Sequence, residues 1–192
     1  SEPCTDSPLF TLENVVATPH LGASTDEAQE KAGIAVAKSV RLALAGELVP
    51  DAVNVQGGQI DEAVKAVLPL AEQIGAVACG LATAAVERVD IEALGEIVDH
   101  DVRVLELSAL KGVFQVLIHD PVSYVNAPVL AEQRGVDVAL TTQTASGDHR
   151  SLVRVKLTLT DGSTVRVGGT VASPRQIGKI VEVDDFDVDV PL

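Results

Sequence analysis

The residue best suited to chemistry in this sequence is His20, because imidazole is the side chain that ordinarily exchanges its proton near neutral pH. It follows Thr18 and Pro19 at the end of an apolar run that begins at Asn14. Eighteen residues before it, Glu2 offers a carboxylate that could orient and charge the imidazole. The pattern indicates acid–base chemistry; the alternative is that the ring only satisfies backbone groups after a proline turn.

Two elements must position this histidine. We predict a short buried strand over Val15 to Ala17 and, after the histidine, a long amphipathic helix. Ser24 is expected to cap that helix, with Glu27 completing a capping box, and not to act as a nucleophile. Gly46 is expected to end the helix. Glu27 and Lys31 have the spacing of an i,i+4 ion pair. One helix face carries small apolar side chains that need a partner surface, namely Ala28, Ala32, Ala35, Val36, Val40 and Ala43.

A linker or turn is indicated by Gln56-Gly57-Gly58-Gln59, within a stretch of residues 50–59 that breaks the helical pattern. We therefore predict two parts, residues 1–56 and residues 57–192. The second part begins with a helical pattern over 61–81. Its Pro69 is expected at a first helical position, because proline is not tolerated inside an undisturbed helix. The inward face would consist of Ala71, Ile74 and Ala78.

The remaining pattern predicts a mixed α+β fold with a largely antiparallel sheet. Charged and apolar residues alternate over 88–93, which is typical of a half-buried strand. Asp161-Gly162 lies between two alternating segments, which is typical of a β-hairpin. The other expected elements are helices over 104–117 and 124–134, a strand from Val136 to Leu140, hairpin strands over 153–159 and 165–167, a turn or short helix over 173–176, and a last strand over 179–190.

Composition excludes several function classes. The formal net charge of -14 argues against nucleic acid and against an anionic membrane surface, since both bind basic proteins. The sequence shows no secretory signal pattern, and we expect no apolar run long enough to cross a bilayer. Cys4 and Cys79 lack the spacing of a zinc site or a disulfide framework, so we expect no metal, and Cys79 is predicted to be a small core residue. A soluble, cytoplasmic protein is the default expectation.

The basic side chains are concentrated in residues 134–179. This segment holds seven of the fourteen lysines and arginines but only three acidic residues. One interpretation is a solvated strand face, because Arg154, Lys156 and Arg166 alternate with apolar neighbours. The other is an anion site, because arginine matches phosphate geometry and lysine adds a point charge. The three other histidines, His100, His119 and His149, are expected at the surface or in turns.

Several motifs lie along the chain, at residues 2–3, 12–15, 18–25 (Thr-Pro-His-Leu-Gly-Ala-Ser-Thr), 27–29, 51–55, 105–113 (Leu-Glu-Leu-Ser-Ala-Leu-Lys-Gly-Val), 124–128 and 174–176. Together they resemble D-3-phosphoglycerate dehydrogenase of the long, actinobacterial type, and the resemblance extends over essentially the whole sequence. The segment 18–25 alone resembles many D-2-hydroxyacid dehydrogenases, and the motifs of the second half narrow the resemblance to the phosphoglycerate enzyme.

The resemblance implies an enzyme that oxidises 3-phosphoglycerate to 3-phosphohydroxypyruvate with NAD, the first step of L-serine synthesis. By position in the motif, His20 would take the substrate hydroxyl proton and Glu2 would steady the imidazolium. It also implies a regulatory, anion-binding intervening domain, in which Lys179 and Arg175 are the candidate effector or phosphate ligands. The acidic run that follows, residues 184–189, is a departure from what such a site would need.

The resemblance also implies that this chain is part of a longer enzyme. No Gly-rich nucleotide loop follows a strand pattern in it. We therefore expect a remnant of the substrate-binding domain in residues 1–56 and the intervening domain in 57–192, without the nucleotide-binding and serine-sensing (ACT) domains. The chain alone would be inactive, and the whole enzyme a homo-oligomer that binds a phosphorylated hydroxy acid. The alternative is a stand-alone regulatory, anion-binding and assembly module without catalysis.

Overall fold

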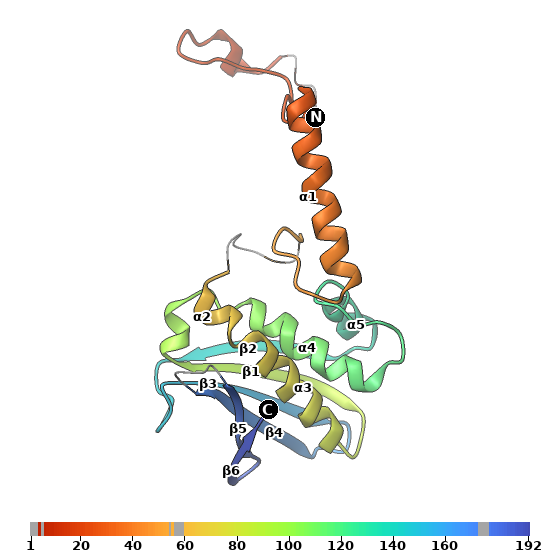
Figure 1. Cartoon of the computed structure of the whole chain (residues 1–192), viewed down its shortest axis with the longest axis vertical. Coiled ribbons are helices and arrows are strands. Elements are labelled where there is room, and N and C mark those ends of the chain that lie inside the picture. Colours follow the sequence, from red (N-terminus) through yellow and green to blue (C-terminus); the bar gives the residue numbers. More distant parts are fainter. Residues whose placement is uncertain (1–3, 5, 54, 56–59, 173–176) are drawn as a thin grey trace. The chain divides into compact units, whose positions relative to one another are not determined.

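The computed structural model describes residues 4, 6–53, 55, 60–172 and 177–192, which fall into two compact units, residues 1–41 and 42–192 (Figure 1). The described residues form helices and a six-stranded sheet, which confirms the predicted α+β class.

The first unit consists of a short 3-10 helix, η1 (Pro8–Thr11), an extended loop and most of helix α1 (Asp26–Leu44). The strand predicted over Val15 to Ala17 is wrong, because these residues have no strand geometry and Val16 is 92% exposed. A strand requires a neighbour to accept its backbone hydrogen bonds. No other strand is described in this unit that could provide them.

Helix α1 is capped one residue later than predicted. The side chain of Thr25, and not Ser24, accepts a hydrogen bond from the backbone N–H of Ala28 at 3.2 Å. The predicted pair of Lys31 and Glu27 is confirmed, with 2.6 Å between Nζ and Oε1. Gly46 follows the helix with a φ of 70°, which matches its predicted role at the helix end. No side chain of α1 is buried, so its apolar stripe has no partner within its unit.

The second unit contains one mixed sheet with strand order β2-β1-β3-β4-β5-β6 (Figure 1). Among the described strands, only β1 and β2 pair in parallel, and a parallel connection needs a crossover, which α4 and α5 provide. All other pairs are antiparallel. The strands are β1 (Val86–Gly95), β2 (Asp137–Gln143), β3 (Ser151–Leu159), β4 (Thr164–Ala172), β5 (Ile177–Val183) and β6 (Phe186–Pro191).

Helices cover one face of this sheet (Figure 1). They are α2 (Glu62–Lys65), α3 (Leu68–Leu81), α4 (Val104–Leu117) and α5 (Ala127–Gln133), and a 3-10 helix, η2 (Glu96–Asp99), follows β1. Pro69 lies in the first turn of α3, as predicted. The side chains of Ala71, Ile74 and Ala78 are fully buried, and so are Val89, Ile91 and Ala93 of β1. The core is therefore aliphatic, with α3 and α4 packed on the inner face of the sheet.

The hairpin predicted around Asp161-Gly162 joins β3 to β4. Gly162 has a φ of 83°, a conformation that glycine adopts without strain. The strand predicted over 179–190 is instead two strands, β5 and β6, because the chain turns at Asp184, whose φ is 51°. Aspartate tolerates this left-handed conformation better than most residues. The acidic run therefore contains a turn, which its charge alone did not predict.

The segment Glu62–Leu81 has the length and hydropathy to cross a membrane, whereas none was expected from the sequence. Half of this segment is buried inside the unit (50%), and a break after Lys65 divides it into α2 and α3. Its apolar side chains contact the sheet, as those of a core helix in a soluble domain do.

Candidate functional site

His20 lies in the extended loop before α1. Ser7 caps η1 by accepting a hydrogen bond from the backbone N–H of Leu9 at 3.3 Å, and this turn places Phe10 beside the loop. A cavity of about 860 Å³ is lined by Cys4, Phe10, Val15, Ala17, Thr18, Pro19 and His20. Its walls are mainly apolar, and His20 contributes the imidazole. The first unit thus brings the predicted acid–base residue to a hollow large enough for a small molecule.

The predicted partner of His20 is Glu2, which lies outside the described residues. The ring of His20 approaches Gly22, where an added Cβ would be 3.7 Å from Nε2. That distance is ordinary van der Waals contact, so this position does not by itself require glycine. The loop shape is set instead by Pro19 and by the capped start of α1.

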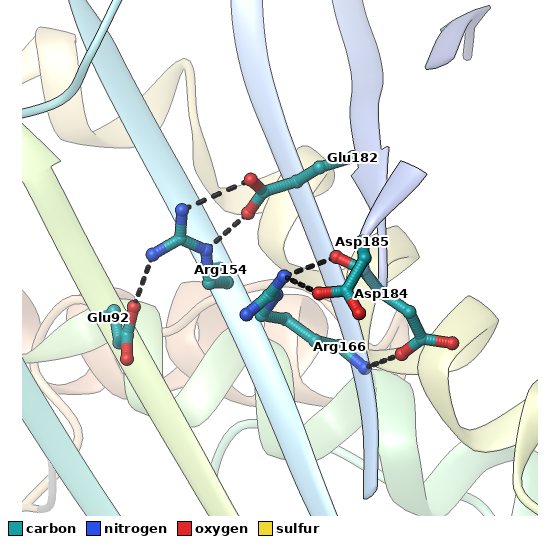
Figure 2. Close-up of polar contacts among 6 residues, drawn as sticks. All are labelled: Glu92, Arg154, Arg166, Glu182, Asp184 and Asp185. Carbon is teal, nitrogen blue, oxygen red and sulfur yellow. Dashed lines mark hydrogen bonds and ion pairs between the residues drawn. The ribbon is translucent and has the colours of Figure 1, made fainter. Parts of the chain in front are cut away.

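The basic segment contributes side chains to the open face of the sheet, opposite the helices. Arg154 on β3 lies between two carboxylates, as Figure 2 shows. Its Nη1 donates to Glu92 of β1 at 2.7 Å, and its Nε and Nη2 donate to Glu182 of β5, the latter at 3.1 Å. The hydrogen bond to Glu182 is the largest cause that raises the pKa of the guanidinium, and burial opposes it. Arg154 therefore links three strands across the sheet.

Gly168 makes room for this network. A Cβ at Gly168 would lie 2.2 Å from Oε1 of Glu182, so the carboxylate occupies the space where a side chain would be. Arg166 on β4 forms a second group beside it (Figure 2). It bonds to the carbonyl of Asp184 and, at 3.1 Å, to the carboxylate of Asp185, while its backbone N–H donates to Asp184 at 2.8 Å. Arg166 thereby fixes the β5–β6 turn.

Lys179 on β5 lies on the same open face. Its ammonium is 2.7 Å from Oδ1 of Asp189 on β6. The side chain of Asp189 is 70% exposed, so the carboxylate that pairs with Lys179 is largely accessible to solvent. Arg175, the other predicted ligand, lies outside the described residues. Arg154, Arg166 and Lys179 are thus each paired with carboxylates on this face.

A second cavity, which the sequence did not predict, lies between α2, η2 and the ends of β3 and β4. Its volume is about 290 Å³. At its rim, His100 Nδ1 is 3.2 Å from the carboxylate of Asp61, which also caps α2 by accepting from Ala63 N–H at 2.8 Å. Arg150 and Glu96 form an ion pair there at 2.5 Å. No sequence spacing connects His100 to a residue 39 positions earlier, so only the fold reveals this pair.

Of the residues that the structure describes, no group of three or more histidine, cysteine, aspartate or glutamate side chains is placed to hold a metal ion. Cys4 and Cys79 are both free thiols, and burial raises the pKa of the Cys79 thiol. Cys79 is 5% exposed, which confirms its predicted place in the core.

A mixed sheet covered on one face by two long helices, preceded in sequence by a long helix and a loop with one histidine, defines the class of the described residues as an α+β module. Residues 63–184 match the family model of the D-3-phosphoglycerate dehydrogenase intervening domain. This chain belongs to that family, which confirms the resemblance found in the sequence.

Full-length relatives extend the similarity to the first unit. The chain is 50% identical over 190 residues to D-3-phosphoglycerate dehydrogenase of Mycobacterium leprae, covering 99% of this chain and 36% of that protein. It is 49% identical to the Mycobacterium tuberculosis enzyme, with the same coverage. It is 33% identical over 193 residues to the Synechocystis enzyme, covering 99% of this chain and 34% of that protein. The chain thus spans about a third of the length of these dehydrogenases.

Proposed function

We propose that this chain is the part of an NAD-dependent D-3-phosphoglycerate dehydrogenase that supplies the acid–base histidine and the intervening domain, in a cytoplasmic enzyme of L-serine synthesis. The single observation that carries the proposal is the 50% identity to a D-3-phosphoglycerate dehydrogenase over 190 residues, which includes the loop around His20. The cavity beside His20 is the matching structural feature.

In this proposal, His20 accepts the proton of the substrate hydroxyl, and NAD held by the rest of the enzyme would supply the hydride acceptor. Glu2 would stabilise the imidazolium that forms, because a nearby carboxylate favours the charged ring. The substrate class is a phosphorylated hydroxy acid, as the names of the relatives indicate.

The described residues do not fit NAD itself. A dinucleotide site needs a Gly-rich turn between a strand and a helix N-terminus, which binds the pyrophosphate. In the described sheet, β1 ends at Gly95 and is followed directly by the 3-10 helix η2, and no described strand leads through a Gly-rich turn into a helix. We therefore derive no step through the cofactor from these residues and assign hydride transfer to the whole enzyme.

The test is His20→Asn in the full-length protein, with His119→Asn as the matched control. His119 is an exposed histidine after α4, far in sequence from the proposed site. Loss of a general base typically costs about 10²–10⁴-fold in rate. We expect a loss of this size in kcat for NADH formation from 3-phosphoglycerate, and no loss for the control. Full activity of His20→Asn, or substantial NADH formation by residues 1–192 alone, would contradict the proposal.

A second proposal concerns an anionic effector near Lys179. Among the basic side chains described on the open face, Lys179 is opposed by one carboxylate, Asp189, that is largely exposed, whereas Arg154 is held by two. A phosphate group could displace Asp189, because an exposed carboxylate gives up little when it returns to water. Arg175 follows β4 in sequence and is the second candidate ligand.

Phosphate is expected to raise the melting temperature of the chain, as binding to the native state requires. Lys179→Ala should abolish the shift, and Asp189→Asn should enlarge it by removing the competing carboxylate. Lys65→Ala is the control, since Lys65 forms an exposed ion pair with Glu62 on α2. Equal shifts in the wild type and Lys179→Ala at millimolar phosphate would show that no such site exists at Lys179.

A further inference from the structure

The two outer strands of the sheet, β2 and β6, differ in how their edges are protected. An unpaired strand edge attracts other strands, and native proteins normally protect it with charges, proline or bulges. The edge at β6 has all three: Asp187 and Asp189 are on the strand, Pro191 is near its end, and the register shifts between Ile180 and Glu182.

The edge at β2 has almost none of these features. Its sequence, Asp-Val-Ala-Leu-Thr-Thr-Gln, contains one charge and no lysine, arginine or proline. It pairs with β1 over all seven residues without a register shift. A regular strand with several β-branched side chains is therefore presented at the edge of the sheet.

This edge is also open. Thr141, Thr142 and Gln143 are exposed, and no backbone hydrogen bond from outside the sheet reaches 137–143 among the described residues. A groove of about 430 Å³ runs between α4, α5 and the start of β2, and Val136 and Val138 form part of its wall. The apolar wall of this groove therefore lies directly beside the start of the strand.

We propose that β2 pairs antiparallel with β2 of a second copy of this chain, around a two-fold axis at Leu140. Side chains alternate between the two faces of a sheet, and residues paired across two strands lie on the same face. Even-numbered residues of one copy must therefore pair with even-numbered residues of the other. Val138 and Leu140 pack against the core and define the helix-side face. Centring the axis on Leu140 pairs all seven residues, whereas a shift by two residues in either direction shortens the pairing.

The same register is compatible with the charges. It places Asp137 opposite Gln143 of the second copy, Val138 opposite Thr142, and Ala139 opposite Thr141. The single charge of each strand therefore faces a neutral amide that can donate a hydrogen bond. No like charges oppose each other, although the whole chain carries a formal net charge of -14. This self-complementarity identifies a second copy as the partner.

The first test changes Gln143 in residues 1–192 and measures the dimer dissociation constant by sedimentation equilibrium. Gln143→Lys would create two symmetric pairs with Asp137 and should lower the constant by about twofold to thirtyfold. Gln143→Glu would place like charges opposite and should raise it. Thr141→Lys is the control for net charge, because it makes the same change opposite Ala139 and should not strengthen association.

The second test reports the register. In a Cys4→Ser background, Leu140→Cys should form an intermolecular disulfide under mild oxidation, because the two thiols would be directly opposite at the axis. Ala139→Cys and Thr141→Cys should cross-link several-fold less, since each would lie two residues from its counterpart. A monomer at every concentration, equal effects of Gln143→Lys and Thr141→Lys, or equal cross-linking at the three positions would overturn the proposal.

Discussion

Gly112→Ala is expected to destabilise the second unit by about 2–3 kcal/mol. A Cβ at Gly112 would lie 1.9 Å from the carbonyl oxygen of Glu72 and 2.8 Å from its carbonyl carbon. These are backbone atoms of α3, so no rotamer change can relieve the clash and the helices must separate. Overpacking costs typically about 1–3 kcal/mol, and more when backbone must shift. The better helix propensity of alanine returns about 1 kcal/mol.

Gly75 of α3 also indicates close backbone contact between the two helices, because a Cβ added there would lie 2.3 Å from the carbonyl oxygen of Ala109 in α4. The matched control is Gly80→Ala. Gly80 is also in α3, but a Cβ added there would meet nothing within 4 Å. Urea unfolding followed by circular dichroism should show Gly112→Ala less stable and Gly80→Ala slightly more stable than the wild type. Equal effects of the two changes would mean that α3 and α4 are not in close backbone contact.

The second large effect is expected for the ion pair between α3 and α4. Lys111 Nζ is 3.0 Å from the carboxylate of Glu72, and the two side chains are only 11% and 23% exposed. The ammonium also lies 4.8 Å from the ring centroid of Tyr124. Removing one member of a buried pair leaves an uncompensated charge, which costs about 3–5 kcal/mol when burial is complete. Because this pair is partly exposed, we expect about 2–3 kcal/mol for Lys111→Met.

A double-mutant cycle checks this prediction. Glu72→Leu should also destabilise the unit, because it leaves the ammonium of Lys111 without its carboxylate. The double variant Glu72→Leu/Lys111→Met should recover much of the loss, since a buried ion pair and an apolar pair of similar volume are often comparable in stability. Additive losses in the urea midpoints would show that the two side chains are not energetically coupled.

Local sequence signals predicted most elements of the second unit. The helix over 104–117 coincides with α4, the alternation over 88–93 lies within β1, and Asp161-Gly162 marks the β3–β4 turn. These signals depend on residues that are close in sequence, so a short window of the sequence is enough to predict the element. The strand predicted over 15–17 failed because a strand also needs a partner. The single strand predicted over 179–190 failed because one aspartate, Asp184, adopts a positive φ and divides it into β5 and β6.

The candidate site was predictable to a smaller extent. The sequence singled out His20 and Lys179, and the structure places one beside a cavity and the other on the open sheet face. Their proposed partners Glu2 and Arg175 lie outside the described residues. The sequence could not show that Arg154 is held by Glu92 and Glu182, which lie 62 and 28 positions away. Such pairs arise from strand register, which composition and spacing do not determine.

The surroundings of Tyr124 have a practical consequence. The chain contains one tyrosine and no tryptophan. Tyr124 is 7% exposed, and its hydroxyl lies 3.4 Å from the carboxylate of Glu72. Ultraviolet emission excited in its phenol ring therefore reports on one place, the packing of the turn before α5 against α3 and α4. The protein carries its own optical probe there, and this part of its unfolding can be followed without any label.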